Sequence, residues 1–402
     1  MISTYDGELL HGTFYRQIST GLRRSMPTHP VAKVRCWGVG EWGLLPAGTR
    51  AALLADADED VRERAQRQAR YQDSAWVERE LPDRSCHARW DILMYRALSR
   101  AVVDTVLTAP VAEREREAIA GNPSLHSDVV VLLSTDPDPA VREAIAHRAD
   151  LGPAERRALA ADPDPRVRER IARRADLGPA ERRALAADPD PKVRLALSVH
   201  PELSEEERAE IDYEIPTDEC FYLEAEPSVP RDPQDVRRDA SSAHPLLRRK
   251  AATDRSLPPD LVARLAVDDD LGVRVLLAQH HPDAPASLLL RSFLEYNGHE
   301  RAHLTTRPNF PTTGLSAFAD HDDPEVRALA ARDPQAAPAT VERLTRDPDP
   351  AVRAALARHP NLPQPRLTEL LDDEELAHAA AANPALDSEV VHRLVAMRGQ
   401  RE

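Results

Sequence analysis

The chain has 402 residues, a formal net charge of −15 and 30% charged residues, but only 4% aromatic residues. It contains no apolar run of about 18 residues, so we expect no membrane span, and the opening MISTYDGELLHG lacks the apolar stretch of a secretory signal. The three cysteines, Cys36, Cys86 and Cys220, are too scattered for a disulfide framework or a cysteine metal site, which predicts a cytoplasmic protein without a cofactor.

A repeat of 26–27 residues organises most of the chain. The segments DPDPAVREAIAHRADLGPAERRALAA from Asp136 and DPDPRVRERIARRADLGPAERRALAA from Asp162 are nearly identical, and another copy begins at Asp188. A Val-Arg pair, or a weaker equivalent, recurs at this spacing from Val34 onward, which predicts about fourteen repeats. The expected parts are a cap segment at residues 1–30, one solenoid at 31–395 and a tail at 396–402.

Each repeat predicts two short helices. The turn Asp347–Pro350 offers an Asp N-cap and a Pro for the first helical turn. The stretch AVRAALARH from Ala351 then places its apolar residues at i, i+3 and i+4. A residue before proline is pushed out of the α region, so His359-Pro360 ends the helix, and a second helix follows, as in LGPAERRALAAD from Leu151. One repeat cannot bury its apolar stripe alone, so stacked repeats are expected.

The string DPDPAVRAALARHPNLP, from Asp347 to Pro363, resembles the leucine-rich repeat variant family. Its Asp-x-Asp-x-x-Val-Arg core also resembles the longer HEAT repeats. The resemblance implies an all-α fold, a right-handed α-solenoid in which α and 3-10 helices alternate. A repeat of 26 residues leaves about eight residues for each helix, so the second element is expected to be a short α-helix or a 3-10 helix.

The first 100 residues hold all four tryptophans. Trp and Arg often anchor protein interfaces, so one hypothesis is a partner-binding surface on the first repeats. The other is a cap in which bulky side chains shield the open end of the stack. The residues concerned are Arg23, Arg24, Arg35, Trp37, Trp42, Trp76 and Trp90.

An arginine follows the anchor residue in most repeats. Such a column would suit a nucleic acid or another polyanion. The alternative is a structural ladder. Aspartates closely precede nearly every such arginine, as Asp162 and Asp164 precede Arg168, and an arginine fork can bridge a carboxylate and a backbone carbonyl. The negative net charge favours the ladder. Its clearest members are Arg142, Arg168, Arg194, Arg274, Arg327 and Arg353.

The repeat pattern degenerates around residues 204–246. The segment from Ser204 to Glu226 contains ten acidic residues and one basic residue, with Tyr213, Phe221 and Tyr222 among them. An acidic aromatic surface could bind a basic partner, while a solvated loop or a kink explains the same composition.

The residues His299-Glu300-Arg301-Ala302-His303 match the H-E-x-x-H pattern. On one helix the two histidines could bind zinc while Glu300 activates water, as in a hydrolase. The match lies at the start of a repeat helix and has no third ligand at a familiar spacing. His299 and His303 are therefore the only metal-site candidates, and we expect no bound metal.

These features together predict a non-catalytic scaffold that binds another macromolecule, most readily a protein, through a curved surface. The first alternative is a nucleic-acid-binding or DNA glycosylase-like repeat protein, which the net charge disfavours. The second is the zinc hydrolase. No Gly-rich phosphate loop, Gly-x-Ser-x-Gly elbow or Cys-x-x-Cys pair is present, so we expect no enzyme activity. Because the chain has no long apolar run, we also expect no membrane partner.

Overall fold

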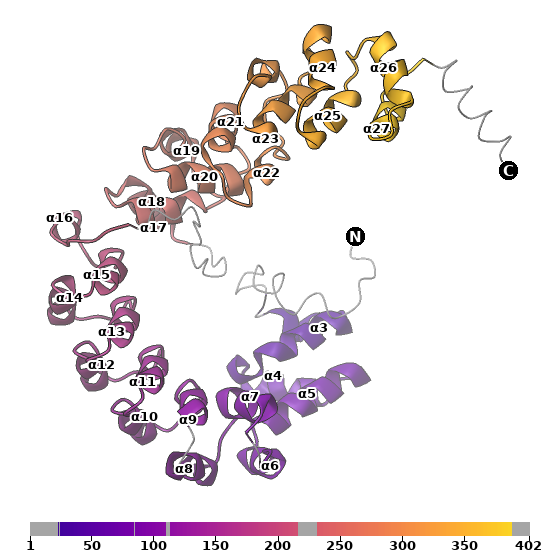
Figure 1. Cartoon of the computed structure of the whole chain (residues 1–402). Coiled ribbons are helices and arrows are strands. Elements are labelled where there is room, and N and C mark those ends of the chain that lie inside the picture. The colour runs from indigo at the N-terminus through magenta and orange to yellow at the C-terminus, as the bar shows by residue number, and fades with distance from the viewer. Residues whose placement is uncertain (1–22, 24, 84, 110–112, 216–230, 388–402) are drawn as a thin grey trace. The chain divides into compact units, whose positions relative to one another are not determined.

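The computed structural model describes residues 23, 25–83, 85–109, 113–215 and 231–387, which form helices and turns and contain no strand (Figure 1). The all-α class predicted from the repeat is therefore confirmed. None of the helices in these ranges combines the length and the apolar character needed to cross a bilayer.

Contacts divide the chain into two compact units. The first contains the described residues up to 215, together with 231–235 and 242–247. The second contains 236–241 and the described residues from 248 onward. One uninterrupted solenoid over residues 31–395 stays a prediction.

The first unit begins with irregular helices and continues with regular pairs. Its helices are η1 (Met26–Thr28), α3 (Ala32–Gly38), η2 (Val39–Leu44), α4 (Ala47–Leu54), α5 (Glu59–Tyr71), α6 (Ser74–Glu80), α7 (His87–Tyr95), α8 (Arg100–Thr108), α9 (Glu113–Ala120), α10 (Ser127–Leu133), α11 (Pro139–Ala146), α12 (Pro153–Leu159), α13 (Pro165–Ala172), α14 (Pro179–Ala186), α15 (Pro191–Ser198) and α16 (Glu205–Ala209).

Two helices, α17 (Pro233–Ser241) and α18 (Pro245–Ala252), hold residues of both units. The second unit continues with α19 (Pro259–Leu265), α20 (Leu271–His280), α21 (Ala286–Glu295), α22 (Arg301–Leu304), η3 (Leu315–Phe318), α23 (Pro324–Arg327), η4 (Ala328–Arg332), α24 (Pro338–Leu344), α25 (Pro350–Ala357), α26 (Gln364–Leu371) and α27 (Ala377–Ala381).

The DPDP turn starts the first helix of a repeat. Before α11, a carboxylate oxygen of Asp136 accepts the amide N–H of Asp138, and the Asp138 carboxylate accepts the N–H of Ala140, both at 2.9 Å. Pro139 occupies the first helical position, where its missing N–H costs nothing. The same N-cap is formed by Asp164, Asp190, Asp323 and Asp349.

The apolar stripe of each repeat lies in a seam shared with its neighbours. Val141 and Ile145 of α11 are fully buried, and Leu159 of α12 packs in the same cluster. In the next repeat Val167, Ile171 and Leu185 take the same places. In the second unit the seam contains Val352, Leu356, Leu367 and Leu370. The core is therefore a continuous row of aliphatic side chains, in which each repeat contributes the same positions.

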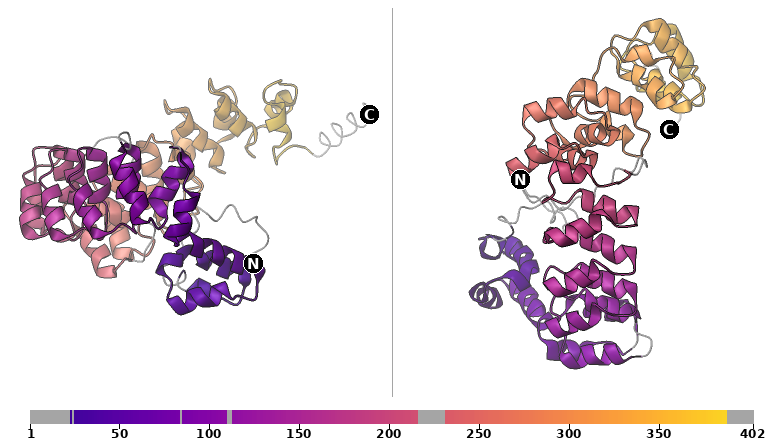
Figure 2. Two further views of the ribbon diagram at one scale, coloured as in Figure 1. Left: turned by 90° about the horizontal axis from the view of Figure 1, so that it is seen from below. Right: turned by 90° about the vertical axis from the view of Figure 1, so that its left-hand side faces the viewer.

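From α9 to α16 the helices of the first unit lie in two rows, with the helices seen nearly end-on in Figure 1 and from the side in the right-hand view of Figure 2. The first helices α9, α11, α13 and α15 pack directly on one another, whereas the second helices α10, α12 and α14 pack mainly on first helices. Because the first helices approach one another more closely, their row forms the inner side of the bend within this unit.

The second helices are mostly α-helices and not the 3-10 helices of an alternating pattern. The helices α12, α19 and α24 each contain seven α-helical residues. The exception is η3, which follows Gly314 at φ 76°, a left-handed conformation that favours glycine.

Candidate functional site

The arginine after each anchor valine joins two repeats. In α11 the guanidinium of Arg142 donates from Nε and Nη2 to the two carboxylate oxygens of Asp162, at 2.7 and 2.9 Å. Its Nη1 also donates to the carbonyl oxygen of Asp136, at 2.7 Å. One side chain thus holds its own DPDP turn and the turn of the following repeat. The hydrogen bonds that Arg142 donates to Asp162 raise the pKa of Arg142, so this arginine stays charged.

The same bridge recurs along both units. Arg168 with Asp188, Arg248 with Asp268 and Arg327 with Asp347 repeat the paired contact to a carboxylate. The remaining predicted ladder members also have partners: Arg194 contacts the carbonyl and the carboxylate of Asp212, Arg274 pairs with Glu295, and Arg353 pairs with Glu375. These guanidinium groups already bind acids within the chain, so the column offers no open track to a polyanion.

A second polar column lies at the opposite ends of the first helices, and sequence reasoning missed it. Arg174 donates from Nη1 to the carbonyl oxygens of Ala146 and Arg148, one repeat earlier. His200 contacts the carbonyl of Arg174 at 2.9 Å in the same way. The sequence pattern indicates only that a helix ends at such a position, as at His359 before Pro360. Other members are Asn122, Arg148, His359 and Asn383.

The two columns leave a strip of each first helix facing solvent, and that strip distinguishes two adjacent repeats. Residues 136–161 and 162–187 differ at three positions only. Ala140, Ala144 and His147 of the earlier repeat are replaced by Arg166, Arg170 and Arg173, which we call the arginine face. These positions are spaced i, i+4 and i+7, so they share one side of the helix. All six side chains are half-buried or exposed.

The exposed side chains of the second helices do not differ between these two repeats. The exposed pairs Ala154 and Ala180, Arg157 and Arg183, and Ala158 and Ala184 are identical. Differences are therefore confined to the solvent side of the first helix and are not spread over all exposed positions. The three differences can be seen in the sequence, but the sequence does not tell which side of the helix is exposed.

Two of the N-terminal candidates have structural roles. Trp42 is only 4% exposed and packs with Val39, Leu53 and Val61, so its side chain offers little surface to a partner. Its large ring fills the core under the irregular first helices, as a cap requires. Arg35 pairs with Asp56 at 2.7 Å and lowers the pKa of that carboxyl, as the ladder arginines do.

The other three tryptophans are half-buried. Trp76 lies 5.8 Å from the ring of Tyr71, and Trp90 makes an edge contact with Tyr95 and packs against the first-unit core. Trp37 lies in α3. Arg23 is half-buried, and Arg24 lies outside the described residues. The structure does not gather these side chains into one exposed patch.

The degenerate region brings a serine and a histidine together. Tyr213 stacks on the His244 ring at 4.3 Å, and Ser198 Oγ lies 2.8 Å from His244 Nε2. His244 Nδ1 accepts the N–H of Leu246, so the neutral ring carries its proton on Nε2 and donates it to Ser198. The serine in turn donates to the Leu195 carbonyl. The pair is therefore not a nucleophile and base. Phe221 and Tyr222 lie outside the described residues.

The H-E-x-x-H residues do not share one helix. Helix α22 begins at Arg301, so His299 and Glu300 precede it. Glu300 contacts both His303, at 2.5 Å, and His299, at 3.2 Å, and the hydrogen bond with His303 lowers the pKa of Glu300. In the described part of the chain, no three His, Cys, Asp or Glu side chains gather as a metal site.

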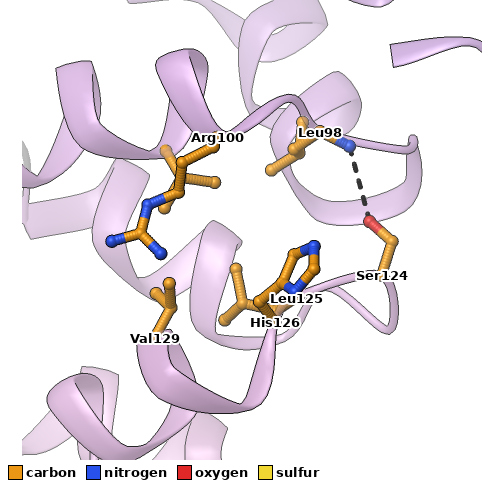
Figure 3. A pocket seen from close by; sticks show the side chains of 7 residues that line it. Leu98, Arg100, Ser124, Leu125, His126 and Val129 are labelled. Atoms are coloured by element: carbon orange, nitrogen blue, oxygen red, sulfur yellow. Dashed lines mark hydrogen bonds between the residues drawn. The ribbon is translucent and has the colours of Figure 1, made fainter.

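A shallow hollow lies between the starts of α8 and α10 (Figure 3). Arg100 pairs with Asp104 and Asp128, which lie beside the hollow, and the Leu98 amide donates to Ser124 Oγ. His126 is exposed, and the rest of the lining is aliphatic. It is lined by Leu98, Arg100, Val103, Ser124, Leu125, His126 and Val129.

Comparisons with known proteins agree with the repeat. Residues 350–375 match the family model described as leucine rich repeat variant, which confirms the resemblance seen in the sequence for this repeat. A solved structure titled "a leucine-rich repeat variant with a novel repetitive protein structural motif" is 21% identical, covering 68% of this chain and 87% of its own, with a TM-score of 0.28. A search of curated proteins finds no match.

Proposed function

We propose that this chain is a non-catalytic helical-repeat scaffold that binds another protein in the cytoplasm through the exposed strip of its first helices. The two polar columns and the apolar seam fix how repeats stack. The strip between the columns is free to vary without disturbing that stacking.

The observation that carries the proposal is the difference between residues 136–161 and 162–187. Substitutions without a role in binding would fall on the exposed sides of both helices, because exposed positions can change with little effect on stability. All three fall on the first helix, and all three introduce arginine, a residue enriched where proteins bind one another. This pattern is typical of a constant framework that presents a variable contact surface.

The experiment exploits the near-identity of the two repeats. The variant R166A/R170A/R173H gives the second repeat the exposed strip of the first, so its framework is already known to accept these residues. The control R157A/R183A removes two exposed arginines from the second helices of the same repeats. Wild type and both variants are used as full-length baits in a native extract, and the captured proteins are quantified by mass spectrometry.

We expect at least one protein to be retained by wild type and by the control but lost from the face variant. The same set of captured proteins with all three baits would contradict the proposal. Capture of a nucleic acid in place of a protein would also contradict it and would favour the alternative class.

A further inference from the structure

We infer that the partner presents an acidic segment carrying apolar side chains, and that this segment docks on the exposed strips of α13 and α15. The inference rests on the proposed function and specifies the chemistry of its partner. It follows from the arginine face and from the side chains that the next repeat places beside it.

The arginine face concentrates positive charge on one short helix. Its members stand one helical turn apart, so their Cα atoms span about 10 Å along α13. Arg166 pairs with Asp164 at 3.0 Å and Arg173 with Glu169 at 2.5 Å. Arg170 is half-buried and makes no ion pair with any described residue.

The two internal ion pairs leave Arg166 and Arg173 able to pair with a partner's carboxylates. Arg166 and Arg173 keep 60% and 44% of their side-chain surface exposed, whereas ladder arginines such as Arg168 keep 12%. Exposed ion pairs contribute little to stability, so replacing Asp164 or Glu169 by a partner's carboxylate costs little. Arg166 and Arg168, two residues apart on the same helix, thus have opposite roles.

The neighbouring helix α15 adds one cation and two apolar side chains. Lys192 occupies the position that corresponds to Arg166, one repeat later, and is exposed. Leu195 on this helix and Val199 directly after it are half-buried, at the positions of Glu169 and Arg173. A segment crossing from α13 to α15 would therefore pair carboxylates with arginines and lay apolar side chains on Leu195 and Val199.

This combination favours an acidic peptide over a nucleic acid. On the other side of α13, helix α11 presents Ala140, Ala144 and Glu143, so the positive surface does not continue as a track along the stack. A strand of phosphates would reach only a few cations here, and the net charge of −15 would oppose its approach. Leu195 and Val199 also offer nothing to a phosphate backbone.

The test uses a phage-displayed library of random dodecamer peptides, selected on the full-length protein and on R166A/R170A. We expect Asp and Glu, together with aliphatic residues, to be enriched on wild type and not on the variant. Peptides without acidic enrichment, or equal enrichment on both proteins, would overturn the inference.

The best selected peptide is then labelled and titrated into each protein. Its affinity should fall about tenfold or more in R166A/R170A, because two charge-assisted contacts are lost, and should stay within about twofold in R157A/R183A. It should also weaken as salt rises. Equal losses in the two variants would overturn the inference, as would a single-stranded DNA dodecamer that displaces the peptide at lower concentration.

These outcomes separate the inference from the proposed function. If a captured protein depends on the arginine face but selected peptides are not acidic, the scaffold function stands and the acidic docking fails. If no captured protein depends on that face, the proposed function fails irrespective of the peptide result.

Discussion

Arg168 and Asp188 form a two-point ion pair that fastens one repeat to the next. Arg168 Nε and Nη2 lie 2.7 and 2.9 Å from the two carboxylate oxygens, and both side chains are largely buried. Arg168 Nη1 also donates to the carbonyls of Asp162, at 2.7 Å, and Pro163, at 3.2 Å, so four hydrogen bonds converge on one guanidinium. The pair therefore sets how far apart and at what angle the repeats stand.

Replacing Arg168 by lysine should lower the free energy of unfolding by about 1–3 kcal/mol, because an ammonium group cannot reproduce the planar fork and leaves buried acceptors unsatisfied. Urea unfolding measures the change. Arg183→Lys, at an exposed position of α14, is the matched control and should change stability by less than about 0.5 kcal/mol. Equal effects of the two substitutions would show that the ladder contributes no stability.

Stability should fall in acid through the ladder carboxylates. The hydrogen bond that Arg327 donates holds the pKa of Asp347 below the ordinary value of about 3.8 for an aspartate. A depressed folded pKa means that this stabilisation is fully present above pH 3.8 and is lost as pH falls below 3.8 toward the folded value. Unfolding free energy measured from pH 7 down to pH 2 should therefore drop in that window.

Asp347→Asn tests which group is responsible for this acid sensitivity. The variant should be less stable than wild type at pH 7 and should show a shallower loss of stability below pH 3.8, because one titrating carboxyl is absent. An unchanged slope would mean that other groups govern acid unfolding.

The repeat and its local geometry could be predicted because they depend on residues that are close together in the sequence. Asp and Pro in the DPDP turn act on the backbone within a few residues, so the N-cap at Asp349 and the helix start at Pro350 match the expectation. The buried anchors Val167 and Val352 likewise follow from the period of the apolar residues.

The second polar column could not be predicted, because its contacts span one whole repeat. Asn122, Arg174 and His200 differ in chemistry, and each reaches carbonyl groups of the preceding repeat. Only the stacked geometry shows that they occupy equivalent places. Similarly, composition alone cannot tell that Trp42 is buried while Arg166 is exposed. The candidate binding surface therefore lies on α13 and not at the tryptophans.

Deleting residues 162–187 should leave a folded, shorter protein. Arg142 would then meet Asp188 in place of Asp162, and His200 would meet the carbonyl of Arg148 in place of that of Arg174, so both columns close again. Circular dichroism should give the same helical signal per residue, with cooperative unfolding. A deletion of residues 162–174 removes half a repeat and should abolish that cooperativity. Equal loss from both deletions would contradict nearest-neighbour stacking.

Ser292 should be replaceable by alanine with a gain in stability. It lies fully buried in α21, and its hydroxyl oxygen has no hydrogen-bond partner. The equivalent position of regular repeats holds leucine, as at Leu159 and Leu185, so the site is built for an apolar side chain.

Removing the buried hydroxyl eliminates its desolvation penalty, so Ser292→Ala should raise the unfolding free energy by about 1 kcal/mol, measured by urea unfolding. Ser287→Ala, on the exposed side of the same helix, controls for helix propensity and should have a smaller effect. A loss of stability in Ser292→Ala beyond that control would mean that the hydroxyl is bound in solution, and water or a polar ligand would then have to occupy this part of the seam.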